Sequence, residues 1–600
     1  MILSPIDWAL IASYFLFSLY IGLRYRKQAS KSMSDFFVSG RNLTWWMAGT
    51  SMVATSFAAD TPLAITAFIA RDGLAGNWFW WAAAMSGMLV AFLYARMWRR
   101  SEVVTDTELL ELRYTGKPAA VLRGYRASYI ALFVCTIVMG WVTGAMVNVL
   151  KHTVLVDSVG SIPHIDWIII ACLLAATAAY TLLAGLKGVV VTDFFQFMVA
   201  MIGCIILAVV AVSHIGGIDV MQEKLVENYG STQVMDMMPG FGEDSWLPLD
   251  IFFILIFVRW WASSGPGDEP GGGGAQLQRL LSTKNEKESV KAALWYSIAN
   301  YCVRPWPWII AAFAALALFP ELRLMAESGT GDPGVGYPML ITAVSPPGLA
   351  GLMLVVFFAA YMSTISSIIN WGASFLVNDV YKRFVRKGES ERHYAKASKA
   401  GTFVVLILGG IVAYLMQDVS IDEAWKILAA LGAGTGPVFL LRWFWWRINA
   451  WTEISAMLSS LVVSLTLNSV LDVRTEYVIV ITCFVTIAVW LTVTLLTKPE
   501  PEEHLSAFYR KVRPGGPGWG PIAAANPDVN VDKHIGLSVL AAMVASLGVF
   551  FVLGAIKYLI FFNASWLAIT LGSTFLCFYV VAILMRKIGL TDDVVEPVTA

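Results

Sequence analysis

The chain has 600 residues, of which 58% are hydrophobic and 14% are charged, and its mean hydropathy is +0.67. Soluble domains carry about 25% charged residues, so this composition excludes a soluble globular protein and favours a membrane protein. The 42 basic and 42 acidic residues balance to a net charge of zero, and no basic patch with interleaved aromatic residues indicates nucleic acid as a partner.

Apolar runs of about 20 residues, the length that a helix needs to cross a bilayer, recur along the whole chain. We predict an all-α polytopic protein with about fifteen membrane-spanning helices. The expected ranges are 5–24, 44–70, 78–98, 127–150, 165–185, 189–213, 247–264, 290–318, 347–378, 398–416, 421–441, 450–470, 475–497, 535–556 and 566–585. Most Lys and Arg residues fall in connections that are cytoplasmic if the N-terminus is outside, which predicts an N-out, C-in orientation. The first span has no clear cleavage site, so we expect it to be retained rather than removed as a signal peptide.

The second expected span, 44–70, is interrupted in its middle by the sequence AADTP, residues 58–62. Pro62 has no N–H and clashes with the preceding helical turn, and the carboxylate of Asp60 needs a partner at this depth. One interpretation is a proline kink, with Asp60 paired to an arginine. The other is a discontinuous helix whose exposed carbonyl groups face a cavity.

Asp193 lies about one turn inside the sixth expected span, 189–213, next to Thr192 and one turn before Gln196. An acidic residue in that position can cap the helix N-terminus, where the helix dipole favours negative charge. The sequence position alone leaves open whether Asp193 is such a cap or a functional residue.

The seventh expected span, 247–264, runs into GPGDEPGGGG, residues 265–274. Six glycines and two prolines in ten residues cannot form regular helix. Spans two and seven are therefore both interrupted, and they lie five spans apart. An odd offset reverses the direction through the membrane, which predicts two five-span units in inverted topology with binding sites near the bilayer midplane.

The ninth expected span, 347–378, carries a polar stripe along one side. Oxygen-bearing groups in a membrane are costly unless a neighbouring helix or a bound ion meets them. Spacings of four, three and four residues put the stripe on one helical face. It consists of Ser363, Ser367, Asn370 and Ser374, flanked by Thr364 and Ser366.

These elements divide the chain into five parts. We expect an extra N-terminal transmembrane helix with a basic cytoplasmic loop at 1–43, a first five-helix repeat at 44–213, an external loop at 214–246, a second five-helix repeat at 247–441, and peripheral C-terminal helices at 442–600 that include a proline-rich cytoplasmic linker at 498–534.

Four signatures in register resemble the sodium:solute symporter family, whose members include sugar, proline, sialic acid, iodide and vitamin transporters. The signatures are DFFVSGRNLTWW with GTSMVATSFAAD, GLKGVVVTDFFQ, QRLLSTKN, and AAYMSTISS with NDVYKRF. The resemblance covers roughly residues 5–445. It implies the five-plus-five inverted-repeat fold also seen in leucine transporters, with span 44–70 as the first core helix and span 347–378 as the eighth.

The resemblance implies a sodium ion held between the break of the first core helix and the eighth helix. Carried over by position, its ligands are the carbonyl groups of Ala54, Phe57 and Ala360 and the hydroxyls of Ser363 and Thr364. Five mostly neutral oxygens suit a hard, weakly held monovalent cation. Ala360, Ser363 and Thr364 also share one helix face. The alternative for the hydroxyls is helix packing, or bonding back to the i−4 carbonyl.

Some relatives bind a second sodium ion, and the matching residues here are Asp193, Ser366 and Ser367. The expected cofactor is therefore one sodium ion, with a second as an option. The same packing alternative applies to these two hydroxyls.

The substrate region departs from the pattern of the sugar-transporting relatives, which have an Asn and a Glu-Gln pair in the first core helix. The expected substrate and gate residues here are Ser56, Asp60, Thr61, Trp260, Trp261, Asp268, Glu269 and Arg304. The two tryptophans match an aromatic gate by position, although tryptophan is also common at membrane interfaces. A zwitterion or a sugar would suit both charge signs, and an inorganic anion would suit them less well.

The predicted function is sodium-coupled import of a small polar organic solute by alternating access, in the cell membrane. The alternative is a sodium-binding channel or sensor on the same fold without coupled uptake. A membrane enzyme is disfavoured because the sequence has no His/Asp or Cys/His constellation at membrane depth, and the six cysteines lie in apolar runs without paired spacing. The expected partners are the solute and the lipid bilayer, and no obligate protein partner is indicated.

Overall fold

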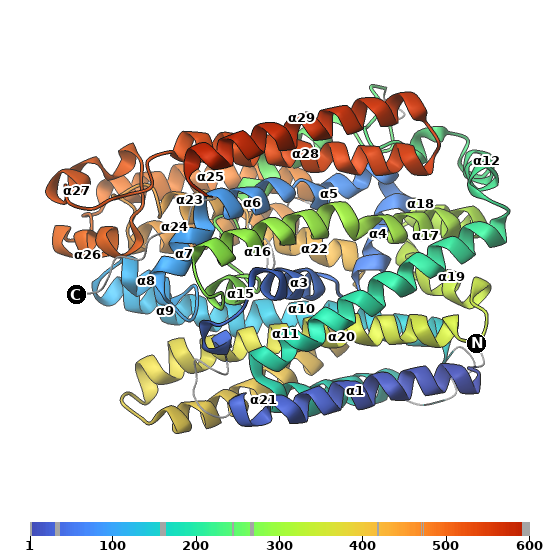
Figure 1. Ribbon diagram of the computed structural model, residues 1–600, viewed down its shortest axis with the longest axis horizontal. Coiled ribbons are helices and arrows are strands. Elements are labelled where there is room, and N and C mark those ends of the chain that lie inside the picture. Colours follow the sequence, from blue (N-terminus) through green and yellow to red (C-terminus); the bar gives the residue numbers. More distant parts are fainter. Residues whose placement is uncertain are drawn as a thin grey trace.

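The structure, a computed structural model, describes most of the chain. The described residues are 3–29, 37–155, 162, 164–242, 245–263, 269–416, 419–469, 471 and 473–590. Within them the chain is mostly helical and its only β-structure is isolated bridges, which confirms the all-α prediction. Most of the helices run along one common axis and form a single bundle (Figure 1).

Eleven helical segments of the described chain are long and apolar enough to cross a membrane, and one bent pair makes a twelfth. They are Pro5–Tyr25, Leu74–Ser101, Gly116–Thr153, Leu186–Ile215, Glu286–Leu318, Leu349–Val385, Glu391–Leu415, Ala450–Asn468, Thr475–Leu496, Ile535–Ile560 and Ala564–Ile588, with the bent pair Trp45–Ser56 and Thr61–Asp72. The chain is therefore an integral multi-pass membrane protein. Of the fifteen expected spans, 165–185 lies in the first part of the long helix α11 (Ile165–Ile215), where the apolar segment Ile165–Ala179 is shorter than a full span. The expected spans 247–264 and 421–441 are represented by short or interrupted helices, so the count of fifteen and the N-out orientation remain predictions.

The first interruption falls where the sequence predicts it. Helix α3 (Trp45–Ser56) ends at Phe57, whose φ of −90° and ψ of 87° leave the helical region, and α4 (Thr61–Asp72) continues after a bend of 56°. Pro62 lies in the first turn of α4. The N–H groups of a first turn have no acceptor within the helix, so the absence of an N–H in proline costs no hydrogen bond there. The interpretation as a discontinuous helix is confirmed, and the last carbonyl groups of α3 lie outside regular helical bonding.

The second interruption separates α14 from α15. The elements on its two sides are α13 (Leu249–Ile254), η7 (Leu255–Arg259) and α14 (Trp260–Ala262), and then α15 (Leu277–Leu281). Between them, Gly271, Gly272 and Gly274 have φ values of 82°, 88° and 85°, which residues other than glycine rarely adopt. The predicted break of this span is confirmed in its described part.

A third interruption is absent from the sequence prediction, which places a single span at 421–441. The structure has two helices there, α22 (Ile421–Leu431) and α23 (Gly436–Leu441). Between them, the N–H of Gly434 donates a 2.8 Å hydrogen bond to the carbonyl of Ala262, at the end of α14. This hydrogen bond pairs a backbone N–H of one interrupted helix with a backbone carbonyl of the other. Irregular segments at membrane depth need such partners, because lipid offers none.

Helix α20 (Leu349–Ser374), continued by η10 (Phe375–Val385), lies inside the bundle. It packs against α1 (Pro5–Ala29), α3, α10 (Cys135–Thr153), α11 (Ile165–Ile215) and α21 (Glu391–Leu415). All residues of α20 are buried except Leu352 and Phe358. A helix that is buried on all sides is usually apolar on all sides. The polar stripe of α20 is therefore an exception that its sequence makes visible.

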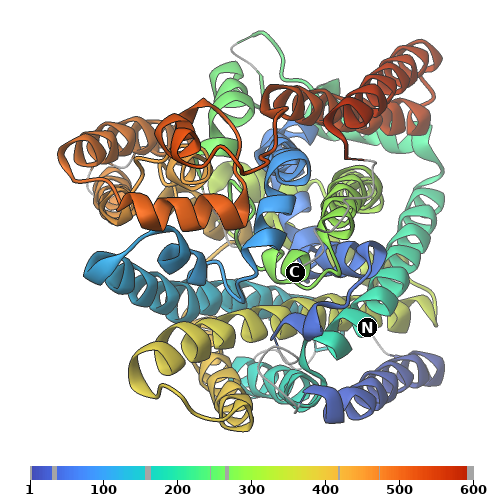
Figure 2. The same ribbon diagram turned by 60° about the vertical axis from the view of Figure 1, so that its left-hand side comes forward.

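The helices that follow the core form two pairs, and α28 and α29 lie side by side along one edge (Figures 1 and 2). The pairs are α24 (Ala450–Ser469) with α25 (Thr475–Leu496), and α28 (Ile535–Ile560) with α29 (Ala564–Ile588). The expected linker 498–534 contains two helices of its own, α26 (Glu502–Val512) and α27 (Gly520–Ala525), and Trp519 beside them is fully buried. The expected loop 214–246 contains α12 (Ile218–Tyr229), which lies at the opposite end of the bundle from α26 (Figure 1).

Candidate functional site

The broken end of α3 lies against the middle of α20. The hydroxyl of Thr364, on α20, donates a 2.9 Å hydrogen bond to the carbonyl oxygen of Thr55, in the last turn of α3. The hydroxyls of Thr55 and Ser367 are 3.1 Å apart, and all three residues are buried. The helix end with its released carbonyl groups and the polar stripe therefore meet in the protein interior.

The five predicted sodium ligands are buried in these same two helical regions. They are Ala54, Phe57, Ala360, Ser363 and Thr364. The carbonyl of Ala54 also accepts the N–H of Phe57 at 3.1 Å. The structure adds the carbonyl of Thr55, between Ala54 and Phe57 in the chain. The family resemblance did not supply this carbonyl, and the residue type alone gives no signal for a backbone oxygen.

Asp193 lies in the interior of α11, which is helical without a break from Ile165 to Ile215. The interpretation of Asp193 as a helix N-cap is therefore wrong. Its carboxylate is fully buried and accepts hydrogen bonds from the hydroxyl of Ser51 at 2.5 Å and from the hydroxyl of Ser363 at 2.6 Å. Asp193 thus contacts a residue predicted for the main sodium site, and it links α11 to both α3 and α20.

Arg279, on α15, fills the space between Asp193 and Ser367. Its guanidinium is fully buried, lies 3.7 Å from the Asp193 carboxylate, and donates hydrogen bonds to the hydroxyls of Ser51 and Ser367. The hydroxyl of Ser366 instead donates to the carbonyl of Ser363 in its own helix, at 3.0 Å. Among the residues predicted for a second sodium ion, Asp193 and Ser367 are joined through a guanidinium. Arg279 could have been noticed as a cation in the short helical segment that follows the glycine-rich break.

A central cavity of about 1190 Å³, its open mouth included, adjoins this contact and touches all three interrupted spans. Of the predicted substrate and gate residues, its lining contains Ser56, Asp60, Thr61, Trp260 and Arg304. Thr55 and Thr364 line it too, so the cavity reaches the contact between α3 and α20. The indole of Trp261 donates to the carbonyl of Phe257 in its own helix at 2.6 Å, and Trp261 is not part of the lining.

Asp60 lines the cavity with only one of its two carboxylate oxygens hydrogen-bonded. Its Oδ2 accepts from the indole N–H of Trp425, on α22, at 3.0 Å, and its Oδ1 is buried without a hydrogen-bond partner among the described residues. The hydrogen-bond partner of this carboxylate is thus an indole rather than the arginine considered from the sequence. Arg304 is the cation whose charge acts on Asp60.

Several polar residues of the cavity have no counterpart in the sequence prediction. The amide of Gln276 donates to the hydroxyl of Ser56 at 2.9 Å, and that hydroxyl lies 3.3 Å from the hydroxyl of Tyr296. The carbonyl oxygens of the Gln276 and Asn300 side chains are buried without hydrogen-bond partners within the described structure. These residues come from the start of α15, α16 (Glu286–Ile298) and η8 (Ala299–Val303), and only the fold brings them to the break of α3.

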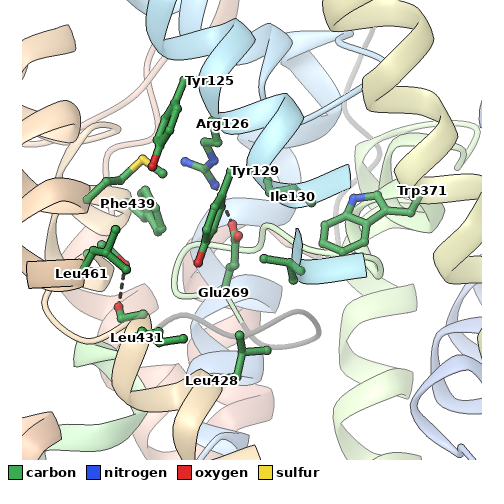
Figure 3. Close-up of a pocket in the computed structure, with 14 residues that line it drawn as sticks. Tyr125, Arg126, Tyr129, Ile130, Glu269, Trp371, Leu428, Leu431, Phe439 and Leu461 are labelled. Atoms are coloured by element: carbon green, nitrogen blue, oxygen red, sulfur yellow. Dashed lines mark hydrogen bonds and ion pairs between the residues drawn. The ribbon is translucent and has the colours of Figure 1, made fainter. Parts of the chain in front are cut away.

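Glu269 lines a different cavity, of about 690 Å³ with its open mouth included, shown in Figure 3. Its carboxylate points toward the guanidinium of Arg126, on α9 (Gly116–Tyr129), at 2.9 Å. Leu428 lines both cavities, so this second cavity is a neighbour of the central one. The structure therefore places Glu269 outside the central cavity, and Asp268 lies outside the described residues.

Comparison with known proteins gives concordant results. The sequence profile of the Sodium:solute symporter family matches residues 36–461. Sodium/glucose cotransporter 4 of Danio rerio is 23% identical over 555 residues, which cover 84% of this chain and 80% of that protein. A sodium/mannose cotransporter of Bos taurus is 25% identical over 502 residues, which cover 77% and 79% of the two chains.

Among solved structures, a Na⁺-coupled sialic acid symporter in a substrate-bound outward-open state superposes with a TM-score of 0.67 at 20% sequence identity. The superposition covers 83% of this chain and 99% of that chain. The two chains share a fold.

Proposed function

The chain belongs to the sodium:solute symporter family, and from this premise we propose that it imports a small polar organic solute across the cell membrane by alternating access. Transport is sodium-coupled, and the relatives that it matches are transporters rather than enzymes. One observation carries the proposal. The hydroxyl of Thr364, on α20, donates a hydrogen bond to the carbonyl of Thr55 at the broken end of α3. This contact lies beside a cavity that is lined by residues of all three interrupted spans.

We propose that sodium binds between the broken end of α3 and α20. The ligands are the carbonyl groups of Ala54, Phe57 and Ala360 and the hydroxyls of Ser363 and Thr364. The hydrogen bond between Thr364 and the carbonyl of Thr55 supports this, because it holds oxygens of both helices at the same depth. Neutral oxygens replace the hydration shell of sodium without trapping it, as a transported ion requires. Bound sodium would tie α3 to α20 and favour one orientation of the broken helix.

The buried charges of Asp193 and Arg279 favour one sodium ion per solute over two. The carboxylate of Asp193 faces the guanidinium of Arg279 at 3.7 Å, and the hydroxyl of Ser367 already accepts from the same guanidinium. A second sodium ion beside Asp193 would lie close to this positive charge in a poorly solvated site, where like charges repel strongly. We propose that Arg279 takes the place that a second sodium ion would need.

The test is uptake into proteoliposomes that contain the purified full-length chain, with an inward gradient of either sodium or choline. A panel of sugars, amino acids and other organic acids supplies the solutes. The expected result is accumulation of one solute class above its external concentration with the sodium gradient only. Uptake that is equal in sodium and choline contradicts the proposal. Uptake that never exceeds equilibration would point to the channel alternative, since a channel cannot accumulate a solute.

A further inference from the structure

We propose that helix α1 positions the sodium-binding face of α20, through the side chains of Asp7 and Tyr14. The helix lies outside residues 36–461, the part of the chain that matches the family profile. Neither residue lines the central cavity, so both act through the helices that they contact rather than on the ion. The inference rests on the proposed function, because it concerns the sodium site between α3 and α20.

The polar side chains of α1 include three that lie on its buried stripe. The helix runs along an edge of the bundle (Figure 1), and its exposed residues include Trp8, Leu16 and Tyr20. The buried residues recur at spacings of four and three, which is one face of a helix. They include Asp7, Ile11, Tyr14, Ser18 and Ile21. Because lipid offers no hydrogen bonds, a carboxylate and hydroxyls on the inward face of such a helix have to be met by its neighbours.

Asp7 caps the N-terminus of α20. Its Oδ1 accepts the N–H groups of Gly348 and Gly351 at 2.8 and 2.6 Å, and its Oδ2 accepts the N–H of Ser4 at 2.8 Å. The first N–H groups of a helix have no acceptor within it, and the helix dipole favours a negative charge there. An added Cβ on Gly351 would lie 2.4 Å from Cα of Asp7, so the two backbones are in contact. This contact fixes the start of α20 relative to α1.

Tyr14 joins α1 to both α11 and α20 beside the predicted sodium ligands. Its hydroxyl accepts a 2.7 Å hydrogen bond from the side-chain amide of Gln196 and donates to the sulfur of Met362 at 3.5 Å. Met362 directly precedes Ser363 in the chain. Gln196 follows Asp193 by three residues, so the two share one side of α11. Tyr14 therefore supports, from the side of α1, the 2.6 Å hydrogen bond between Ser363 and Asp193.

A sodium site of this kind is sensitive to the position of its helices. Three of the five proposed ligands, Ala360, Ser363 and Thr364, belong to α20, so a shift or rotation of that helix displaces them together. Each neutral oxygen has to lie at the correct distance to replace a water of hydration. The contacts of α1 fix the start of α20 through Asp7 and its middle through Tyr14. Loss of either contact therefore weakens sodium binding while the lining of the solute cavity stays the same.

The first experiment measures equilibrium binding of radioactive sodium to the purified full-length chain, with choline holding the ionic strength constant. Tyr14→Phe keeps the ring and loses both hydrogen bonds, and it is expected to raise the sodium dissociation constant about threefold to tenfold. Tyr20→Phe is the matched control, because Tyr20 is exposed on the same helix, and it should bind sodium like the native chain. The number of ions bound at saturation should be the same in all three proteins.

The second experiment tests the cap on α20. Asp7→Ala removes both acceptors and is expected to raise the sodium dissociation constant about tenfold, whereas Asp7→Asn keeps one acceptor oxygen and should lose less. Asp219→Ala is the matched control, because Asp219 is an exposed carboxylate in the first turn of its own helix, α12. The thermal midpoint without sodium reports whether each variant is folded. If Asp7→Ala does not fold, Tyr14→Phe decides.

The outcomes separate this inference from the proposed function. Variants of Asp7 and Tyr14 that have a lower thermal midpoint but the native dissociation constant would show a structural role only. That result overturns the inference and leaves the sodium site standing, and so does an equal rise in Tyr14→Phe and Tyr20→Phe. A native chain that binds no sodium overturns the proposed function itself, and the inference with it.

Discussion

At the scale of single residues, the hydroxyls of α20 have different roles although they lie on or beside one polar stripe. Thr364 reaches across to α3, and Ser363 reaches Asp193 on α11. Ser366 and Ser374 donate to carbonyl groups of their own helix, as serines in membrane helices often do. Bonding within the helix thus accounts for the hydroxyls of Ser366 and Ser374, and the contact to the broken helix singles out Thr364.

Thr364→Ala is expected to raise the sodium concentration that gives half-maximal uptake by about tenfold, because one of the five proposed neutral ligands is lost. Thr364→Ser keeps the hydroxyl and should stay close to the native value. Ser374→Ala on the same helix is the matched control, since its hydroxyl bonds within α20. Sodium titrations of solute uptake measure all three. An unchanged sodium requirement in Thr364→Ala would remove Thr364 from the site.

Arg279 and Asp193 form a fully buried pair, and removing one member leaves the other charge uncompensated. Arg279→Gln is therefore expected to destabilise the protein by about 3–5 kcal/mol. The double variant with Asp193→Asn should lose less than the sum of the single variants, because neither charge then remains alone. Denaturant unfolding of the purified protein measures this cycle. Arg510→Gln, in an exposed pair that solvent screens, should leave the stability almost unchanged. Strict additivity in the cycle would show that the pair is not coupled.

At the scale of elements, the three interruptions act together rather than separately. The end of α14 and the gap between α22 and α23 are joined by the hydrogen bond from Gly434 to Ala262. Gly436 begins α23 so close to α14 that an added Cβ would lie 2.1 Å from the carbonyl oxygen of Trp261. The approach of two backbones is what fixes α22 and α23 against α14, next to the cavity.

Gly436→Ala is expected to force α23 away from α14, at a cost of about 1–3 kcal/mol, and to lower transport by displacing the cavity wall. Gly536→Ala is the matched control, because Gly536 lies in helix α28 with nothing within 4 Å of an added Cβ. That change should be neutral or stabilising by up to about 1 kcal/mol. The thermal midpoint and the uptake rate of both variants check the prediction, and equal behaviour of the two would refute the close packing.

At the scale of the whole molecule, the number of coupled sodium ions sets how far a solute can be concentrated. One charge crossing 100 mV yields about 2.3 kcal/mol, and a tenfold sodium gradient adds about 1.4 kcal/mol. One sodium ion per solute without net charge therefore supports an accumulation of roughly 500-fold, and two ions would support more than about 10⁵-fold.

Because we propose that Arg279 takes the place of a second sodium ion, the lower limit of accumulation is expected. Steady-state accumulation in tight proteoliposomes at a clamped potential measures it, and the ratio of charge to solute flux provides an independent count. Accumulation far beyond a thousandfold would require a second coupled ion and would contradict the role assigned to Arg279.

Much of the fold follows from local properties of the chain. Hydrophobic length predicts membrane spans. Pro62 with Asp60, and the Gly- and Pro-rich run 265–274, predict two of the interruptions, because these signals act through neighbouring residues. The stripe on α20 is visible for the same reason. The break at 432–435 was not predicted, because a few glycines are tolerated in a helix. Its conformation depends instead on the contact with α14.

The sequence by itself determined that this chain is an all-helical multi-pass membrane protein with broken spans and with one span that carries a polar stripe. Only the tertiary structure decided which partners the polar groups meet. Thr364 meets a carbonyl 309 residues away, and Asp60 meets an indole 365 residues away. Such pairings depend on helix packing and rotamers rather than on residue spacing. For the same reason, Arg279 beside Asp193 and the three unsatisfied acceptors of the cavity became visible only in the folded chain.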